Sequence, residues 1–444
     1  MPTPLERGVF FPHAGPARRR EVRTAVAVVA SLLLFGCDAS RPRLSTAPVA
    51  ASDADSVAAI PDETFRDPAP SANLATATTL GGPIAGLDAA DLARFMAGQE
   101  EFEEEETVET GLGPIFNEAS CVTCHDAPVG GTTGRIETRF GSRATGLFDP
   151  LAHLGGSLMQ DRAIGPVENG NGPFTFVPEV VPAQATVTAG RVTTPLFGLG
   201  LVDAVPDAAL FYLARLQAIF SPSTRGTPHL VKETGTGATR VGRFGWKAQV
   251  PTLHQFSGDA YLNEMGITNP EFPDENAPQG NHDALAFNPV PTLNDDGEGV
   301  ESFTDFMTLL GPPPRGPRSI RTEVGGLIFR RIGCANCHTP TLVTGYSPVP
   351  ALSHRVFQPW SDFLLHDMGA LGDGIVQGQA RGRQMRTAPL WGMGSRTVFL
   401  HDGRAKSAQD AILEHSGQGS YSRQRYARLY SGERAALLAF LASL

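Results

Sequence analysis

The sequence has few cysteines, no excess of basic residues and no long apolar run. Only 5 of its 444 residues are cysteine, and beyond two C-x-x-C pairs no cysteine cluster could complete a four-ligand zinc site. The formal net charge is -10 and the pI is about 5.6, without a basic patch that would suit nucleic acid. The apolar run from Ala25 to Phe35 is shorter than the roughly 20 residues of a transmembrane helix. These absences argue against a structural zinc protein, a nucleic-acid-binding protein and an integral membrane protein.

The N-terminal segment is typical of an export signal. Four arginines, at positions 18–20 and 23, precede the apolar run, which ends in LFGC at 34–37. A basic stretch, a short apolar stretch and small residues before a cleavage point describe a secretory signal, and a cysteine at that point resembles a bacterial lipoprotein signal. We therefore predict a lipoprotein-type signal peptide over 1–37 with Cys37 lipidated. An ordinary cleaved signal with an unused cysteine is the alternative.

This signal predicts a location on the periplasmic side of the bacterial envelope. The membrane would be contacted by the lipid anchor only, and the choice between inner and outer membrane stays open. Residues 38–87 are rich in Ala, Ser, Thr, Pro and Asp without helical or strand periodicity, which predicts a disordered tether.

Two C-x-x-C-H motifs carry the other four cysteines. The first contains Cys121, Cys124 and His125, and the second contains Cys334, Cys337 and His338. Such a motif attaches a c-type haem, because the two thiols add across the porphyrin vinyl groups and the histidine becomes the proximal iron ligand. A redox dithiol or half a zinc site could explain one copy, but two copies favour two covalently bound haems.

A second repeat shows that the region around each motif is duplicated. The segment TPLFGLG at 194–200 matches APLWGMG at 388–394, and Arg191 and Arg386 precede the two copies. Two repeated segments in the same order indicate a duplicated domain. We therefore predict a mostly α fold with two cytochrome c-like haem domains in tandem, 88–215 and 316–444, extensive irregular loops, and a connecting region, 216–315.

Helices are expected at several places in this arrangement. We predict one from Asp88, two near 208–220 and 301–310, and an amphipathic one over 321–332 that turns Val324, Leu327, Ile328 and Ile332 to one side. A C-terminal helix from Ser431 would pack across the helix that precedes the second motif. Residues 127–191 are glycine-rich with short β-like pieces, and we expect irregular structure there.

Further residues are candidates for contacts with the haems. Arg191 and Arg386 could pair with haem propionates, because a guanidinium matches a carboxylate, although surface arginines are the alternative. His153 and Met159 are candidate sixth ligands of the first iron, against a loop histidine and a core methionine. Trp246 could relay electrons or fill a core.

Several longer motifs resemble one protein family. They are GPxFN before the first C-x-x-C-H, GLGLVD at 198–203, GRFGWKA at 242–248, EMGIT at 264–268, LHDMG at 365–369, the stretch 386–394 and FLHDGRA at 399–405. Together, over roughly 88–444, they resemble the bacterial dihaem oxidoreductase/peroxidase family, also labelled thiol-oxidoreductase-like. That family is distantly related to dihaem cytochrome c peroxidases and to the dihaem enzyme that matures methylamine dehydrogenase.

The resemblance implies roles for particular residues. The first haem would be the peroxidatic one, with Glu264 in the place of the distal glutamate and Gln255 near that of a distal glutamine. His415 stands where the peroxidases have the methionine sixth ligand of their electron-transfer haem. Because methionine raises a haem potential, a histidine there would lower it. No histidine follows His125 closely, so the first haem is expected to be five-coordinate.

The resemblance also implies an activity and partners. We expect a peroxidase that reduces hydrogen peroxide at the first haem, with electrons from a small donor such as a cytochrome c or cupredoxin relayed by the second. The acidic balance would suit a basic donor or simply solubility. Calcium between the domains and a homodimer would follow the relatives. The alternatives are an electron-transfer cytochrome without substrate chemistry and a dihaem oxidase of a protein, thiol or organic substrate.

Overall fold

The computed structural model describes residues 75–290 and 292–444, which all belong to one compact unit, Pro61–Leu444. The predicted signal peptide, Cys37 and residues 38–74 of the predicted tether lie outside the described residues. No helix in the described part of the chain is both long and apolar enough to cross a membrane.

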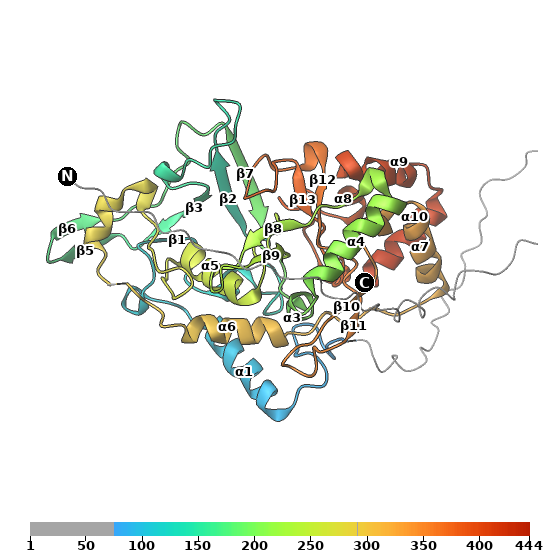
Figure 1. The fold of residues 1–444 in the computed structure, drawn as a ribbon, viewed down its shortest axis with the longest axis horizontal. Helices are drawn as coiled ribbons and strands as arrows, with labels where there is room; N and C mark the ends of the chain where they lie inside the picture. Colours follow the sequence, from blue (N-terminus) through green and yellow to red (C-terminus); the bar gives the residue numbers. More distant parts are fainter. Residues whose placement is uncertain (1–74, 291) are drawn as a thin grey trace, which may run out of the picture. The chain divides into compact units, whose positions relative to one another are not determined.

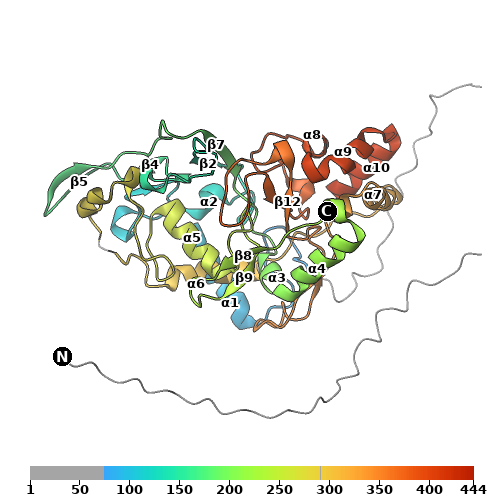
Figure 2. The ribbon, with the colours of Figure 1, turned by 45° about the horizontal axis from the view of Figure 1, so that its top comes forward.

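Ten α-helices and thirteen strands are present in the described ranges (Figures 1 and 2). The helices are α1 Ala89–Glu103, α2 Cys121–Cys124, α3 Leu199–Asp203, α4 Asp207–Phe220, α5 Leu253–Met265, α6 Glu298–Leu309, α7 Ile320–Arg331, α8 Ala408–Glu414, α9 Ser420–Ala427 and α10 Ser431–Ala442. The strands are β1 Ile115–Phe116, β2 Ile136–Gly141, β3 Leu158–Met159, β4 Arg162–Ala163, β5 Pro166–Asn169, β6 Gly172–Thr175, β7 Val187–Val192, β8 His229–Lys232, β9 Thr239–Gly242, β10 Leu342–Val343, β11 Val356–Phe357, β12 Leu365–Asp367 and β13 Gln384–Arg386.

The prediction of a mostly α fold is wrong. Only 36% of the described residues are helical and 16% are in strands, and the strands form small sheets. The largest has the order β3-β2-β7 and lies in the stretch that we expected to be irregular. Its strands β2 and β7 pair antiparallel from Ile136↔Val192 to Gly141↔Val187. Because side chains alternate across a strand, this pairing sends every second residue of β2 toward one face.

The first core lies between α1, α5 and α6. Asp88 caps α1 by accepting hydrogen bonds from the backbone N–H groups of Ala90 and Asp91, so this helix begins where the sequence predicts. Phe95 and Phe102 of α1 stack against Phe306 of α6 with ring centres 5.4 and 4.8 Å apart. The two helices lie side by side in Figure 1, and they bring α1 up to the first C-x-x-C-H motif.

The second core lies between α7 and α10. The C-terminal helix packs across the helix before the second motif, as predicted. The predicted apolar side of α7 is right for Ile328 and Ile332, which are buried, and wrong for Val324 and Leu327, which are 42% and 63% exposed. The buried side is formed by Ile328 and Phe329 together with Gly325, where a Cβ would collide with the carbonyl oxygen of Ala436. A close helix contact at a glycine therefore overrides the apolar periodicity.

The predicted tether is too long at its C-terminal end. Ala75, Ala77 and Ile84 are buried, and the Ile84 N–H donates to the carbonyl of Leu309 at the end of α6. Residues 75–87 are therefore part of the folded unit. One core cluster draws residues from all three predicted segments of 88–444, and the predicted divisions at 215 and 315 stay predictions.

Candidate functional site

Two cavities open around the two C-x-x-C-H motifs. Cys121, Cys124 and His125 line the first, and the corresponding Cys334, Cys337 and His338 line the second. Their empty volumes are about 1260 and 1540 Å³, including the parts open to solvent.

Two histidines face each other across the second cavity. His338 Nδ1 lies 3.0 Å from the carbonyl oxygen of Trp360, and His415 Nδ1 lies 2.7 Å from that of Ala411. Because a carbonyl only accepts, each Nδ1 carries the proton, and each Nε2 is left with its lone pair. Burial lowers the pKa of both imidazoles, that of His338 to about 4, which favours the neutral form that binds metals.

The separation of these rings fits two ligands of one iron. Their centres are 6.4 Å apart. Imidazole nitrogens bind metals at about 2.0–2.1 Å, and roughly 1.2 Å from each nitrogen to its ring centre gives about 6.4 Å for two imidazoles on opposite sides of one metal. The arrangement therefore suits His338 and His415 as the axial pair of a haem.

Two arginines at this cavity, the buried Arg386 and the half-buried Arg396, form no ion pair with a carboxylate among the described residues. Arg386 donates to the carbonyls of Gly245 (2.7 Å) and Thr387 (3.2 Å), and Arg396 to the carbonyl of Pro389 (3.2 Å). Burial lowers the pKa of each to about 10. Two guanidinium groups in an apolar cavity without counterions suit an anionic ligand such as the two propionates of a haem. The sequence pointed to Arg386 but missed Arg396.

The first cavity is lined by one histidine, and by Met265 and Met307. His125 follows α2 and its ring lies 6.0 Å from that of Phe102. Its Nδ1 is buried without a hydrogen bond of good geometry, although the backbone of Gly131 and Thr194 lies near. His153 and Met159, the candidate sixth ligands, do not line this cavity. Among the residues that do line it, His125 is the sole histidine.

Glu264 of α5 lines the same cavity. Its Oε2 accepts a hydrogen bond from Asn117 Nδ2 at 2.7 Å, and its backbone carbonyl accepts from the N–H of Asn117 at 2.7 Å. Burial and the nearby Glu137 raise the pKa of Glu264 to about 8. The GPxFN and EMGIT segments, far apart in the sequence, are thus joined at one wall of the cavity.

Gln255 lies on the same helix but outside the cavity. Its Oε1 accepts from the N–H of Thr234 at 3.1 Å, which ties α5 to the β8–β9 hairpin. The structure therefore gives Gln255 a structural contact and no access to a ligand in the first cavity. Gln249 and Asp259 line the cavity instead, and the sequence reasoning missed both.

Glu137 and Arg139 of β2 also line the first cavity and were missed. Arg139 Nε and Nη2 donate to the two carboxylate oxygens of Glu137 at 2.9 and 3.2 Å. The signal was present in the sequence IETRF at 136–140, because residues two apart in a strand share a face. Because the glycine-rich composition of 127–191 favours irregular structure, the alternation yields no prediction for these two residues.

Arg191 lines the first cavity but is already paired. Its Nη2 lies 2.7 Å from Asp373, whose other oxygen lies 2.7 Å from Lys247 Nζ. All three side chains are at most 2% exposed. Arg191 therefore serves a buried charge cluster that joins β7 to the 369–377 segment, and its charge is largely compensated before any propionate is present.

A family model matches the C-terminal part of the chain. Residues 182–444, more than half of the chain, match the family described as "Di-haem oxidoreductase, putative peroxidase". The chain belongs to this family. The matched range contains the second motif, Glu264 and His415, whereas the first motif precedes it. No curated protein matches the sequence significantly.

Solved structures show only distant likeness to this dihaem oxidoreductase. Hydrazine synthase of Kuenenia stuttgartiensis is 13% identical with a TM-score of 0.36, covering 91% of this chain and 100% of the other. The diheme peroxidase BthA of Burkholderia thailandensis is 13% identical with a TM-score of 0.36, covering 84% and 92%. A MauG-like protein associated with microbial copper homeostasis is 13% identical with a TM-score of 0.30, covering 79% and 89%.

Trp246 lies between the two haem cavities of this dihaem protein. It lines both, as do Val192 and Thr193. Its Nε1 donates to the carbonyl of Val192 at 2.8 Å, and its own carbonyl accepts from the N–H of Arg386 at 2.9 Å. These bonds hold the indole between the sites, so the aromatic is in a position to relay electrons as well as to fill space.

Calcium has no obvious site in the described ranges. No group of three or more His, Cys, Asp or Glu side chains is placed there to hold a metal ion.

Proposed function

We propose that this protein is a periplasm-facing dihaem c-type peroxidase that reduces hydrogen peroxide at the first haem with electrons relayed by the second. The observation that carries the proposal is the contrast between the cavities. The second has two opposed histidines, whereas the first has one histidine and the carboxyl group of Glu264. One cavity thus suits electron transfer and the other suits chemistry.

The cysteines support covalent attachment rather than redox chemistry of their own. Burial raises the pKa of the Cys121, Cys124 and Cys334 thiols to about 12. Thiols that act as nucleophiles or redox dithiols have lowered pKa values, because the thiolate is the reactive form. The four cysteines would therefore hold the two haems as thioethers, with His125 and His338 as proximal ligands.

Glu264 would move protons in the first cavity. When bound, the haem supplies an iron that can accept peroxide and exchange electrons with it. Hydrogen peroxide needs two electrons and two protons to become two water molecules, and one oxygen must leave as its bond breaks. Asn117 holds Oε2 of Glu264 at this wall of the cavity, where the carboxyl group would exchange a proton with the substrate.

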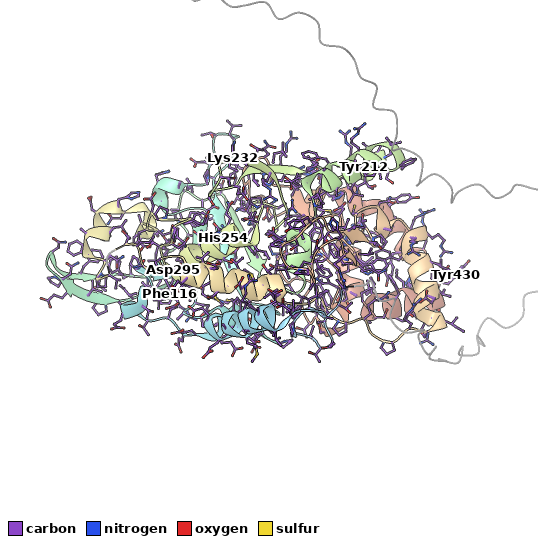
Figure 3. All side chains as sticks on the ribbon, turned by 60° about the horizontal axis from the view of Figure 1, so that its bottom comes forward. Phe116, Tyr212, Lys232, His254, Asp295 and Tyr430 are labelled. Atoms are coloured by element: carbon purple, nitrogen blue, oxygen red, sulfur yellow. The ribbon has the colours of Figure 1, made fainter. Side chains whose placement is uncertain are left out.

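The outer face of α4 is a candidate docking surface for the electron-donor protein. Tyr212, Ile219 and Phe220 are 64%, 66% and 77% exposed (Figure 3). On the inner face, Gln217 donates to the carbonyl of Asn336 within the second motif at 2.9 Å. One helix, about 10–12 Å across, therefore separates this apolar surface from the second haem site.

Local charge favours an acidic donor at this surface, although the whole chain is acidic. Arg215 lies on the exposed face of α4, and residues 208–226 contain no Asp or Glu. Arg225 continues the surface into a cleft that is lined by three further arginines, Arg143, Arg381 and Arg383, and one Asp. We propose that a small acidic cytochrome c or cupredoxin docks here, because complementary charge around an apolar centre steers association.

Two measurements test the peroxidase proposal. In Glu264→Gln, peroxide-dependent oxidation of reduced cytochrome c should fall by about 10²–10⁴-fold, the usual contribution of a positioned acid or base. Glu275→Gln is the matched control, since burial raises the pKa of Glu275 also to about 8 but this residue lies outside the cavity. Unchanged turnover in Glu264→Gln would remove this residue from the chemistry.

Low-temperature EPR of the oxidised protein separates the peroxidase from a pure electron carrier. A peroxidase should show one high-spin and one low-spin ferric haem, with the low-spin signal lost in His415→Ala. Two low-spin signals would instead indicate an electron-transfer cytochrome. A high-spin haem that fails to turn over peroxide would favour a dihaem oxidase of a protein, thiol or organic substrate.

The envelope location is also part of the proposal and rests on the N-terminal sequence. Metabolic labelling with a fatty acid should tag the wild-type protein and not Cys37→Ala. Labelling that persists in Cys37→Ala would exclude Cys37 as the lipidated residue.

A further inference from the structure

A second carboxyl group in the first cavity has no part in the function so far. Glu137 of β2 also lines this cavity, and its carboxyl group lies within hydrogen-bonding reach of that of Glu264. The two residues come from elements that are distant in the sequence, and strand pairing of β2 with β7 positions Glu137 at this wall.

Two hydrogen-bonded carboxyl groups hold one proton between them. If both were ionised, two negative charges would face each other in a buried site, and repulsion would raise one pKa strongly. If both were neutral, the arginine beside them would lack a counterion. The stable arrangement therefore has one carboxylic acid and one carboxylate.

The surroundings decide which residue carries the proton. Burial acts on both groups, but the fork of Arg139 binds both oxygens of Glu137 and holds the pKa of that carboxyl below its usual value. Glu264 has only the neutral amide of Asn117 at 2.7 Å, and its pKa is raised. A pair of groups whose pKa values are driven apart in this way divides into an acid and a base.

We propose that Glu137 is the positioning residue for Glu264, its carboxylate accepting the hydrogen bond that keeps a proton on Glu264 for delivery to the departing oxygen of peroxide. This inference rests on the proposed peroxidase function. It gives the cavity a defined proton at neutral pH, which a lone distal glutamate of ordinary pKa would not have.

The protons balance in the proposed cleavage of the O–O bond. As the O–O bond breaks, the proton of Glu264 goes to the departing oxygen, which leaves as water. The proton from the remaining oxygen of peroxide returns to the pair, which ends with one proton as it began. Two protons from solvent and two electrons from the donor protein complete the second water.

Other charged groups face Glu264 and must be considered in any pH dependence. They come from four parts of the chain: Arg139 of β2, Arg191 of β7, Asp259 of α5, and Glu118, Cys124 and Arg135 beside the first motif. Glu118 and Arg135 form an ion pair at 3.0 Å, so neither presents an uncompensated charge.

The test is an infrared titration of the holoprotein. It follows the absorption band of the protonated Glu264 carboxyl group, which is assigned by its absence in Glu264→Gln. In Glu137→Gln, loss of the neighbouring negative charge should lower the midpoint of this band by about one pH unit or more. The pH profile of peroxide turnover should move in the same direction. Asp161→Asn is the matched control, because it removes a carboxylate that pairs with Arg135 at 2.8 Å outside the cavity.

A second variant tests the proposal if Glu137→Gln does not fold. Glu137→Gln leaves Arg139 buried without a counterion, which can destabilise the fold, whereas Glu137→Gln/Arg139→Gln replaces the ion pair by two neutral amides. Because Arg139 lowers the pKa of Glu264 and Glu137 raises it more strongly, the double variant should show a smaller downward shift of the band than Glu137→Gln. A midpoint at or above that of the wild type in either folded variant would overturn the proposal.

The infrared result is independent of the peroxidase proposal. A shifted band without peroxide turnover in the wild type would support the pair and reject the function. Turnover that depends on Glu264 but shows neither a shifted band nor a shifted profile in Glu137→Gln would retain the function and reject the pair.

Discussion

His338 and His415 lie opposite each other across the second cavity, with their ring centres 6.4 Å apart and each Nδ1 against a backbone carbonyl. His415 is held by the C-terminal end of α8, and His338 follows the turn after α7. Two elements of the C-terminal part of the chain thus bring the two imidazoles to one cavity, where both would be available to hold the iron of a haem.

Replacing this histidine should change the potential of the second haem. His415→Met is expected to raise its midpoint by on the order of 100 mV, within the ~0.8 V range that axial ligands span, because a thioether favours the ferrous state more than an imidazole does. Spectroelectrochemistry of the holoprotein measures the change. An unaltered potential and low-spin spectrum would show that His415 does not bind the iron.

Arg396 should affect the same haem through its charge. Arg396 lies at the cavity without an ion-pair partner in the described part of the chain. Arg396→Gln therefore removes an uncompensated positive charge, and this loss favours the ferric state of the haem. We expect a lower midpoint potential for the second haem and no change for the first. The exposed Arg428→Gln serves as the control, and equal potentials in both variants would contradict a haem contact of Arg396.

The α4 surface should determine how fast a donor protein reduces the second haem. Arg215 and Arg225 are exposed, so Arg215→Glu/Arg225→Glu should fold normally and slow reduction by an acidic cupredoxin at least about tenfold at low salt. The effect should shrink as salt screens the charges. Stopped-flow absorbance measures the rate, and reduction by an uncharged small-molecule hydroquinone is the comparison that should be unaffected.

Exposed arginines on α7 provide the matched control for this surface. Arg321 and Arg330 are also exposed on a helix with apolar residues on its outer side. If Arg321→Glu/Arg330→Glu slows the acidic donor as much as the α4 variant does, the donor does not select α4.

Gly325 should be critical for stability. Its Cβ would collide with the carbonyl oxygen of Ala436 on α10, so Gly325→Ala is expected to cost about 1–3 kcal/mol through overpacking. Gly432, near the start of α10, has nothing within 4 Å of an added Cβ, and Gly432→Ala should be neutral or slightly stabilising. Denaturant unfolding of the two holoprotein variants compares them, and equal midpoints would contradict the close α7–α10 contact.

Local features of the sequence predicted the parts of the site that depend on short segments. The C-x-x-C-H motifs place two thiols and a histidine within five residues, and the spacing alone brings them to one cavity wall. The helix start at Asp88 and the helices near 208–220 and 301–310 were also predicted, because capping and helical periodicity act within a few residues. Glu264 and His415 were found by resemblance rather than by local physics.

Tertiary structure decided the rest. The sequence determined that two haem-type motifs, a candidate distal glutamate and a further histidine exist in this chain, and its membership of the dihaem oxidoreductase family follows from those patterns. It did not reveal that Gln255 faces the β8–β9 hairpin, that Asp373 neutralises Arg191, or that Glu137 meets Glu264. Each of these depends on which strand or helix packs beside another. A one-residue change in strand register turns every side chain of the strand to the other face, and a glycine contact between two helices likewise changes which side chains face the cavity.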